Sequence, residues 1–168
     1  MPGFLLDTNI YGKLAVDPRR VAIRNGLAIS KVIIYGSSVV RKELRATPKR
    51  VVDGINLRLD LLRLYEELTR DRELRTTKKE QDVADSYFST YAKLGGITSL
   101  HKLENDFLIV ASASLHGLPI IVSEDNATML NELALRSYAI VNAVLKLRSP
   151  SFLGYEAFTQ PFKTSSSG

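Results

Sequence analysis

Three short apolar runs constrain the fold of this chain more than any other feature. They cover residues 4–6, 32–35 and 119–122, and each gives way at once to polar residues and then to a helical pattern. Short runs without polar alternation are typical of strands that are buried on both faces. Because parallel strands need a crossing connection, usually a helix, the pattern predicts an α/β fold with three layers, α/β/α, around a central parallel β-sheet.

The segments between these runs carry helical signals. Leucine and tyrosine recur at helical spacing over residues 56–69, and Thr77 with Glu80 has the spacing of a capping box. The segment from Asp106 to His116 is so uniformly apolar or small that it predicts a buried helix opened by Asp106. The pattern also predicts helices over residues 10–16, 21–29, 39–45 and 127–146, a helix through residues 88–91, a strand over residues 74–76, and a final short packed segment over residues 152–155.

The length and composition of the chain fit one domain. With 168 residues, 45% of them hydrophobic, we expect a single domain over residues 1–160 and a flexible tail over residues 161–168. No apolar run reaches the length of a membrane span, and the N-terminus lacks the pattern of a signal peptide. We therefore expect a cytoplasmic protein with no membrane partner.

Cysteine content and net charge narrow the function classes. The absence of cysteine excludes disulfides, zinc–thiolate sites, iron–sulfur clusters and thiol nucleophiles. A formal net charge of +5 favours anionic partners, and it is equally consistent with a solvated basic surface. The sequence also lacks the motifs of serine hydrolases, zinc proteases and nucleotide-binding glycine loops.

Four acidic residues from separated parts of the chain have positions that favour one shared site. Asp7 and Asp125 each follow an apolar strand, Glu43 lies early in the helix after another strand, and Asp106 opens the buried helix before the last strand. Ligands of open parallel sheets bind outside the carboxyl ends of the strands. We therefore predict that the four carboxylates converge at this edge of the sheet.

Converging carboxylates predict a divalent cation. Carboxylates held within a few ångströms of one another repel, and a cation between them removes the conflict. Mg²⁺ and Mn²⁺ prefer shells made of oxygen ligands and keep water in their open positions. A metal of this kind activates water and stabilises negative charge on a phosphate, so the pattern indicates phosphodiester hydrolysis with one or two metals.

Each acid, taken alone, also has an ordinary structural interpretation. Asp7 and Asp125 suit turns and helix caps, Glu43 suits an exposed ion pair, and Asp106 suits the N-terminus of a helix. These interpretations do not explain why an acid follows both the first and the last clear strand. An aspartyl-nucleophile phosphatase is disfavoured because Asn9 stands where a second aspartate is expected, and a receiver-type fold lacks its acidic pair.

The four acids lie in four segments whose residues form a recognisable set. Together these segments resemble the PIN domains, a family that includes the toxin nucleases of toxin–antitoxin pairs. The resemblance extends from residue 3 to about residue 158, although residues 48–96 match only as generic helices. The segments are residues 4–9 (FLLDTN), 38–44 (SVVRKEL), 105–113 (NDFLIVASA) and 117–125 (GLPIIVSED).

The resemblance implies an activity and a metal site. It implies an endoribonuclease that depends on Mg²⁺ or Mn²⁺ and cleaves single-stranded or structured RNA. By match to the family, Asp7, Asp106 and Asp125 are the main metal ligands, directly or through water. Glu43 completes the metal pocket or orients the nucleophilic water, so the same four acids are the expected catalytic residues.

The resemblance also implies supporting residues around the metal. Family members have a hydroxyl residue at the position of Ser123, and Asn9 is expected to act as a further donor behind the metal ligands. Glu104 and Glu124 are left out of the predicted site, because helix and strand geometry points them away from their acidic neighbours.

Three kinds of partner are expected: RNA, an antitoxin protein that blocks the acidic pocket, and a second copy of the chain in a homodimer. The exposed part of the helix over residues 56–69 is a candidate dimer interface. Two alternatives to a toxin stay open, a housekeeping RNA-processing nuclease of the same fold and a non-catalytic RNA-binding or scaffold module. A basic cluster beside Glu43 is a candidate track for the RNA backbone or simply a solvated helix face; it comprises Arg41, Lys42, Arg45, Lys49 and Arg50.

Overall fold

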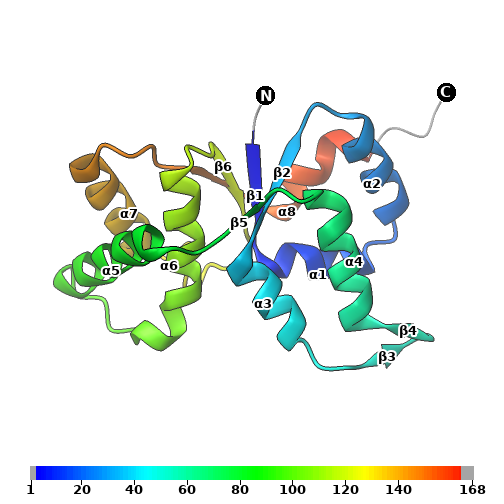
Figure 1. The fold of residues 1–168 in the computed structure, drawn as a ribbon, viewed down its shortest axis with the longest axis horizontal. Helices are drawn as coiled ribbons and strands as arrows, with labels where there is room; N and C mark the ends of the chain where they lie inside the picture. The colour runs from blue at the N-terminus through cyan, green and yellow to red at the C-terminus, as the bar shows by residue number, and fades with distance from the viewer. Residues whose placement is uncertain (1–2, 164–168) are drawn as a thin grey trace.

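A five-stranded sheet forms the centre of the computed structural model, which describes residues 3–163 (Figure 1). The strands are β1 (Gly3–Leu6), β2 (Ile33–Ser37), β5 (Glu73–Leu74), β6 (Ile120–Val122) and β7 (Ser151–Leu153). They lie in the order β5-β2-β1-β6-β7, and every neighbouring pair is parallel. The central parallel sheet predicted from the apolar runs is therefore confirmed.

Helices cover both faces of the sheet, which confirms the predicted three layers (Figure 1). A short helix, α8 (Tyr155–Thr159), and a 3-10 turn, η1 (Gln160–Phe162), follow β7 and pack near α2. One side holds α1 (Thr8–Val16), α2 (Arg20–Ile29), α3 (Ser38–Ala46) and α4 (Leu57–Thr69), and the other holds α5 (Lys78–Lys93), α6 (Leu100–Leu115) and α7 (Glu132–Leu145).

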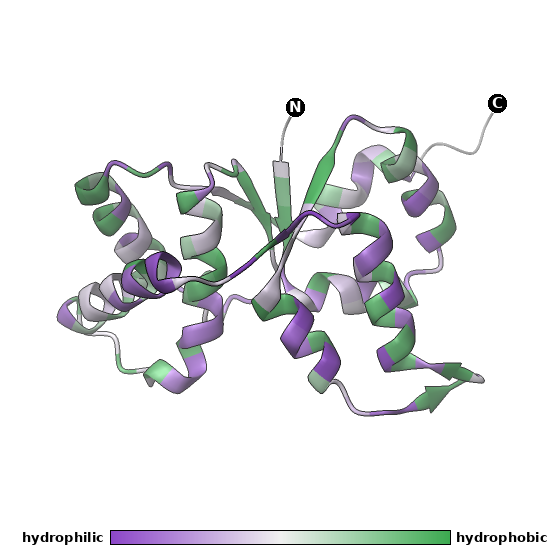
Figure 2. Ribbon diagram, in the orientation of Figure 1, coloured by the Kyte–Doolittle hydropathy of each residue, from purple (hydrophilic) through white to green (hydrophobic). Residues whose placement is uncertain are grey.

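The core is built from the central strands and the helix faces turned toward them. Leu5, Leu6, Ile121 and Val122 are each at most 1% exposed. Full burial of one such side chain contributes about 1.5–3 kcal/mol, so the β1–β6 pair is firmly held. Residues 107–114 of α6 are all buried, as predicted for this helix. Figure 2 shows the same concentration of hydrophobic residues along the strands.

Two helices, α6 and α7, begin several residues away from their predicted first residues. The helix that contains Asp106 begins at Leu100, so Asp106 lies well inside it and does not open it. The first residues of α6 are mostly exposed and polar, which hides their helical periodicity. The start of α7 lies after the predicted Ala127, because the Asp125 carboxylate accepts hydrogen bonds from the backbone N–H groups of Ala127 (3.1 Å) and Thr128 (3.0 Å) and holds this segment in a turn.

Three short elements also depart from the prediction. An antiparallel hairpin of β3 (Val51–Val52) and β4 (Ile55–Asn56) precedes α4, where the sequence pattern predicts no strands. Its tip, Asp53-Gly54, has φ values of 50° and 77°, which tight two-residue hairpin turns require. β5 ends at Leu74 and not at residue 76, and the packed segment predicted over residues 152–155 is the edge strand β7 with the first residue of α8.

The described structure continues into the first residues of the segment expected to be a tail. η1 continues the packed structure beyond residue 160, because buried Phe162 packs against Gly26 of α2, where a Cβ atom would lie only 2.9 Å from the Phe162 Cβ. The rest of the predicted tail, residues 164–168, lies outside the described residues. Within residues 3–163 no helix is long and apolar enough to cross a bilayer.

Candidate active site

The carboxyl edge of the sheet gathers the four predicted acids. Leu5 pairs with Ile121 and Leu6 with Val122, so β1 and β6 end side by side, and the N–H of Asp7 donates to the Val122 carbonyl at 2.9 Å. Asp125 follows β6 and Glu43 lies in α3, directly after β2, while Asp106 reaches the same edge from α6. The charges of all four acids act on one another, which places them in one cluster.

One half of this acidic cluster centres on Asp7, which is only 4% exposed. Its Oδ1 accepts the N–H of Thr8 at 2.7 Å, and its Oδ2 accepts the Ser123 hydroxyl at 2.7 Å. The Thr8 hydroxyl donates to Glu43 Oε1 at 3.0 Å. The first turn of α1 thus fixes two carboxylates, one through its backbone and one through its side chain.

The other half centres on Thr128, which the sequence analysis does not single out. Its hydroxyl is hydrogen-bonded to Asp106 Oδ2 and lies 2.7 Å from Asp125 Oδ2. A hydroxyl has one proton to donate, so it satisfies both carboxylates only when one of them carries a proton. The N–H of Asp125 donates to the Ser123 hydroxyl at 3.1 Å, which joins the two halves of the cluster.

Burial and mutual repulsion raise the pKa values of three acids in the cluster, Asp7, Glu43 and Asp106. Burial, together with the charges of the other three acids, raises the pKa of Asp106 to about 7, against the opposing hydrogen bond from Thr128. Burial also raises the pKa values of Asp7 and Glu43 above their usual ranges. Four ionised carboxylates here would therefore be unstable without a counter-charge.

The donor chemistry of the cluster fits a hard divalent cation. The four acids and the hydroxyls bonded to them present oxygen atoms, and such donors suit Mg²⁺ and Mn²⁺. Within residues 3–163, no three histidine, aspartate or glutamate side chains are arranged to coordinate one metal ion together. A cation would therefore be held partly through water or after side-chain rotations that replace the Thr128 hydroxyl.

The two predicted supporting residues lie differently. Ser123 contacts both Asp7 and Asp125, directly behind the acids. Asn9 has a buried Oδ1 without a hydrogen-bond partner, and in the described chain no hydrogen bond links it to any of the acids. Glu124 points away from the cluster, as expected, since it accepts the N–H of Tyr155 at 2.7 Å.

Three residues in the cluster carried no predicted role, namely Thr8, Asn105 and Thr128. Thr8 and Asn105 both hydrogen-bond to Glu43. The spacing of Thr128, three residues after Asp125, is that of a capping turn, and this is the signal that could have found it. The long helix predicted from Ala127 conceals that signal.

Comparison with known proteins identifies the family. The PIN domain profile matches residues 4–134, which is most of the chain. The chain belongs to the PIN domain family. A search of curated protein sequences finds no match to this PIN domain.

Three solved structures are similar to this PIN domain. VapBC2 from Rickettsia felis, bound to a DNA fragment from their promoter, has a TM-score of 0.59 and 14% identity, and the match covers 90% of this chain and 98% of that one. FitAcB from Neisseria gonorrhoeae has a TM-score of 0.55 and 22% identity over 78% and 92% of the two chains. FitAB bound to an IR36 DNA fragment has a TM-score of 0.57 and 18% identity over 90% and 94%. At these identities the likeness establishes the fold alone.

Proposed function

We propose that this PIN domain is an endoribonuclease that depends on Mg²⁺ or Mn²⁺, and that it is the toxin of a toxin–antitoxin pair. The observation that carries the proposal is the buried acidic cluster at the carboxyl edge of the sheet, where burial and repulsion raise the pKa of Asp106 to about 7. PIN domains are generally nucleases, and a cluster of this kind is the part of the fold that nuclease chemistry requires.

The four acids divide into two roles in this proposal. Asp7, Asp106 and Asp125 hold the cation, directly or through water, and Glu43 completes the pocket or orients the attacking water. When bound, the cation lowers the pKa of water and neutralises charge on the phosphate. Ser123 fixes Oδ2 of Asp7 by its hydrogen bond, so that this carboxylate keeps one orientation.

Exposed cations beside the cluster support an RNA substrate. Arg41 forms ion pairs with Glu73 (Nε to Oε2, 2.5 Å) and with Glu66 (Nη1 to Oε1, 3.1 Å). It therefore contributes little to binding an RNA backbone. The other four members of the predicted basic cluster are exposed and have no ion pair within residues 3–163; they are Lys42, Arg45, Lys49 and Arg50. They extend along α3 and the loop after it, leading away from Glu43.

A groove of mixed polar and apolar lining, with exposed apolar side chains at its edge, supports a protein partner of the antitoxin kind. A cavity of about 560 Å³ lies between α1, α2, α4 and the β3–β4 hairpin. Val16 at its edge is 72% exposed, and Val52 and Ile55 of the hairpin are 53% and 49% exposed. Exposed apolar surface of this kind is typical of surfaces that a partner covers. A homodimer stays a prediction.

Cleavage of labelled RNA by the purified protein tests the nuclease. We expect cleavage of single-stranded or structured RNA with Mn²⁺ or Mg²⁺, none with EDTA, and none by Asp7→Asn or Asp106→Asn. Glu104→Gln is the matched control, since Glu104 lies in the same helix as Asp106 and outside the acidic cluster. Cleavage that survives EDTA or both aspartate substitutions would show that another site, or a contaminant, is responsible.

Expression in cells separates the toxin from a housekeeping nuclease. A toxin arrests growth when expressed alone, and a co-encoded partner relieves the arrest, while Asp106→Asn does not arrest growth. A housekeeping nuclease produces neither the arrest nor the relief. RNA binding without cleavage in any metal would instead favour the non-catalytic module.

A further inference from the structure

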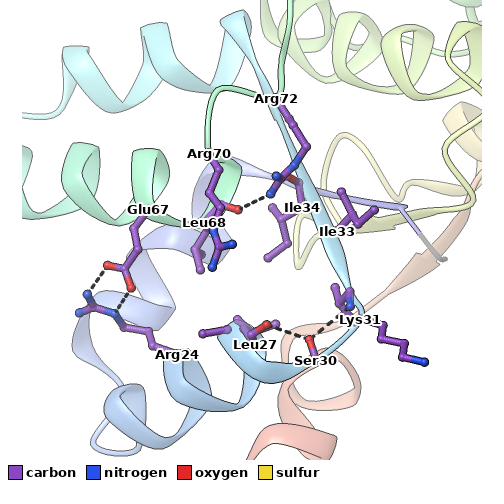
Figure 3. Close-up of a pocket in the computed structure, with 12 residues that line it drawn as sticks. Arg24, Leu27, Ser30, Lys31, Ile33, Ile34, Glu67, Leu68, Arg70 and Arg72 are labelled. Carbon is purple, nitrogen blue, oxygen red and sulfur yellow. Dashed lines mark hydrogen bonds and ion pairs between the residues drawn. The ribbon is translucent and has the colours of Figure 1, made fainter.

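A second cavity lies at the opposite end of the sheet from the acidic cluster. It has a volume of about 250 Å³ and is bounded by the end of α2, the start of β2 and the turn between α4 and β5 (Figure 3). All strands of the sheet are parallel and the acids follow their carboxyl ends, so the start of β2 lies at the far edge. β5 pairs only with Gly36 and Ser37, so no strand lies along the outer edge of β2 at Ile33 and Ile34. The cavity lies at this unpaired edge.

The lining of this cavity is basic. It contains four cationic side chains and a single acid, Glu67, which gives a formal charge of +3. Glu67 is already paired with Arg24 through two contacts, one of 3.2 Å from Arg24 Nε to Glu67 Oε1 and a second from Nη2 to Oε2. In the described part of the chain the other three cations have no ion pair; they are Lys31, Arg70 and Arg72.

Arg72 is oriented without being neutralised. Its Nε donates to the Ile34 carbonyl at 3.2 Å, and its Nη2 donates to the Leu68 carbonyl at 3.3 Å. Both acceptors are neutral, so the guanidinium keeps its full charge while its position is fixed. Figure 3 shows Arg70 and Arg72 directed toward the cavity, whereas the Lys31 side chain at its rim is directed outward.

A structural role for these cations accounts for only part of the charge. α2 ends at Ile29 and α4 ends at Thr69, so two helix C-termini border the cavity. Each C-terminus carries about half a negative elementary charge, and the two together leave about +2 of the +3 uncompensated. Arg72 caps α4 through its side-chain hydrogen bond to the Leu68 carbonyl. Arg70 donates its backbone N–H to the Glu66 carbonyl at 2.9 Å, but within residues 3–163 neither the Arg70 nor the Lys31 side chain donates a hydrogen bond to a helix end.

We propose that this cavity binds the phosphate group of a phosphomonoester, either a free nucleotide or the 5′-phosphate of an RNA strand. A phosphomonoester carries close to two negative charges at neutral pH, which matches the uncompensated charge of the lining. One guanidinium group can donate two parallel hydrogen bonds to two oxygens of the same phosphate group. The two backbone contacts of Arg72 already hold its guanidinium in one orientation for such a contact. Leu27, Ile34 and Leu68 add an apolar wall for the rest of the ligand.

Binding of adenosine 5′-monophosphate, measured by calorimetry, tests this site, and adenosine serves as the uncharged comparator. We expect saturable binding of the nucleotide and of inorganic phosphate, and at least about tenfold weaker binding by Arg70→Gln. Arg136→Gln is the matched control, since Arg136 is exposed on α7, and it should bind within about twofold of the wild type. Asp106→Asn should also bind as the wild type does, so failure here is distinct from failure of the proposed nuclease.

Two RNA strands distinguish the sources of the phosphate. In the Asp106→Asn protein, tighter binding of a 5′-phosphorylated strand than of the same strand with a 5′-hydroxyl would assign the site to RNA ends. Equal binding of the two strands, with the nucleotide still bound, would assign it to free nucleotides. No saturable binding of nucleotide or phosphate up to about 10 mM, or equal binding of adenosine, or no effect of Arg70→Gln would overturn the proposal.

Discussion

The two ends of the central sheet concentrate opposite charges in different ways. At the carboxyl end one acid is buried and three are partly buried, and the hydroxyls of Thr8, Ser123 and Thr128 join them. At the amino end, cations come from helix ends and a turn, and they surround a cavity left by the short strand β5. Like charges are gathered at both ends, but the acids are less exposed than Lys31 and Arg70.

This difference decides what each end requires. Burial disfavours the charged form and is the main reason why the pKa values of Asp7, Glu43 and Asp106 are raised; repulsion among the carboxylates adds to it. Exposed cations are screened by water and salt, so Arg70 and Lys31 can stay charged together. The acids at the carboxyl end therefore need a counter-ion to be fully ionised. The cations at the amino end stay ionised without an anion, although a bound anion would stabilise them.

The largest effect is expected from Asp106→Asn. RNA cleavage should fall by at least about 100-fold, because a metal ligand is lost. In EDTA, however, the variant should be more stable than the wild type by roughly 1–3 kcal/mol at pH 8. The pKa of Asp106 is raised to about 7, so its charged form is disfavoured in the folded state, and this cost is absent below pH 3.8 and complete above about pH 7.

Thermal denaturation as a function of pH checks the second half of this prediction. The advantage of Asp106→Asn should shrink as the pH falls from 8 toward about 4, where the wild-type carboxyl is protonated in both states. Mn²⁺ should raise the melting temperature of the wild type more than that of the variant, because the ion binds only the folded acidic cluster. A variant less stable than the wild type at pH 8 in EDTA would contradict the electrostatic account.

Gly36→Ala is expected to disturb the strand that connects the two ends. A Cβ atom at Gly36 would lie 2.3 Å from the hydroxyl oxygen of Tyr65. Tyr65 is fully buried and its hydroxyl donates to Glu73 at 2.7 Å, so it cannot move freely. We expect a loss of roughly 1–3 kcal/mol in unfolding free energy, measured by urea denaturation.

Gly12→Ala provides the matched control for this substitution. Gly12 lies in the middle of α1, and a Cβ atom there meets nothing within 4 Å. Alanine should stabilise the helix by roughly 0.5–1 kcal/mol, the opposite sign. Equal effects of the two substitutions on the unfolding free energy would show that contact with Tyr65 does not determine the cost of a side chain at residue 36 of β2.

Thr128→Val tests the hydroxyl that joins two acids at the carboxyl end. Valine keeps the shape of threonine and removes the hydroxyl that contacts Asp106 and Asp125. RNA cleavage should fall by about tenfold, in the range seen when a group behind a metal ligand is removed. Thr128→Ser, which restores the hydroxyl, should recover most of the activity, and failure of this rescue would assign Thr128 a packing role.

The sequence is sufficient to predict the carboxyl end but not the amino end. Strand ends are local signals, so acids that follow apolar runs can be assigned to one edge of a parallel sheet from their positions in the chain. Asp7 and Asp125 show this directly. The basic cavity depends on how far β5 extends along β2, and pairing registers between distant segments are not encoded by local patterns.

The same distinction explains the errors within elements. The pattern puts Asp106 at a helix start because the exposed first turns of α6 lack an apolar stripe. The turn around Thr128 escapes prediction because its hydrogen bonds to the Asp125 carboxylate give no hydrophobic signal. Side-chain contacts with the backbone, more than propensities, decide where α7 begins.

A modest effect is expected from Asp17→Asn, a substitution away from both ends that has the opposite electrostatic sign to Asp106→Asn. Burial acts to raise the pKa of Asp17, but hydrogen bonds from Tyr155 (2.7 Å) and Arg19 outweigh it and lower the pKa to about 2. The ionised form is therefore favoured in the folded state, and its contribution is present above pH 3.8 and lost as the pH falls toward about 2. After allowance for solvent screening, Asp17→Asn should destabilise the protein by roughly 1–2 kcal/mol at pH 7. Urea denaturation at pH 7 and pH 3 measures this, and the difference from the wild type should narrow at the lower pH. If Asp17→Asn stabilised the protein at neutral pH in EDTA, as Asp106→Asn is expected to do, then burial, and not the hydrogen bonds from Tyr155 and Arg19, would govern the pKa of Asp17.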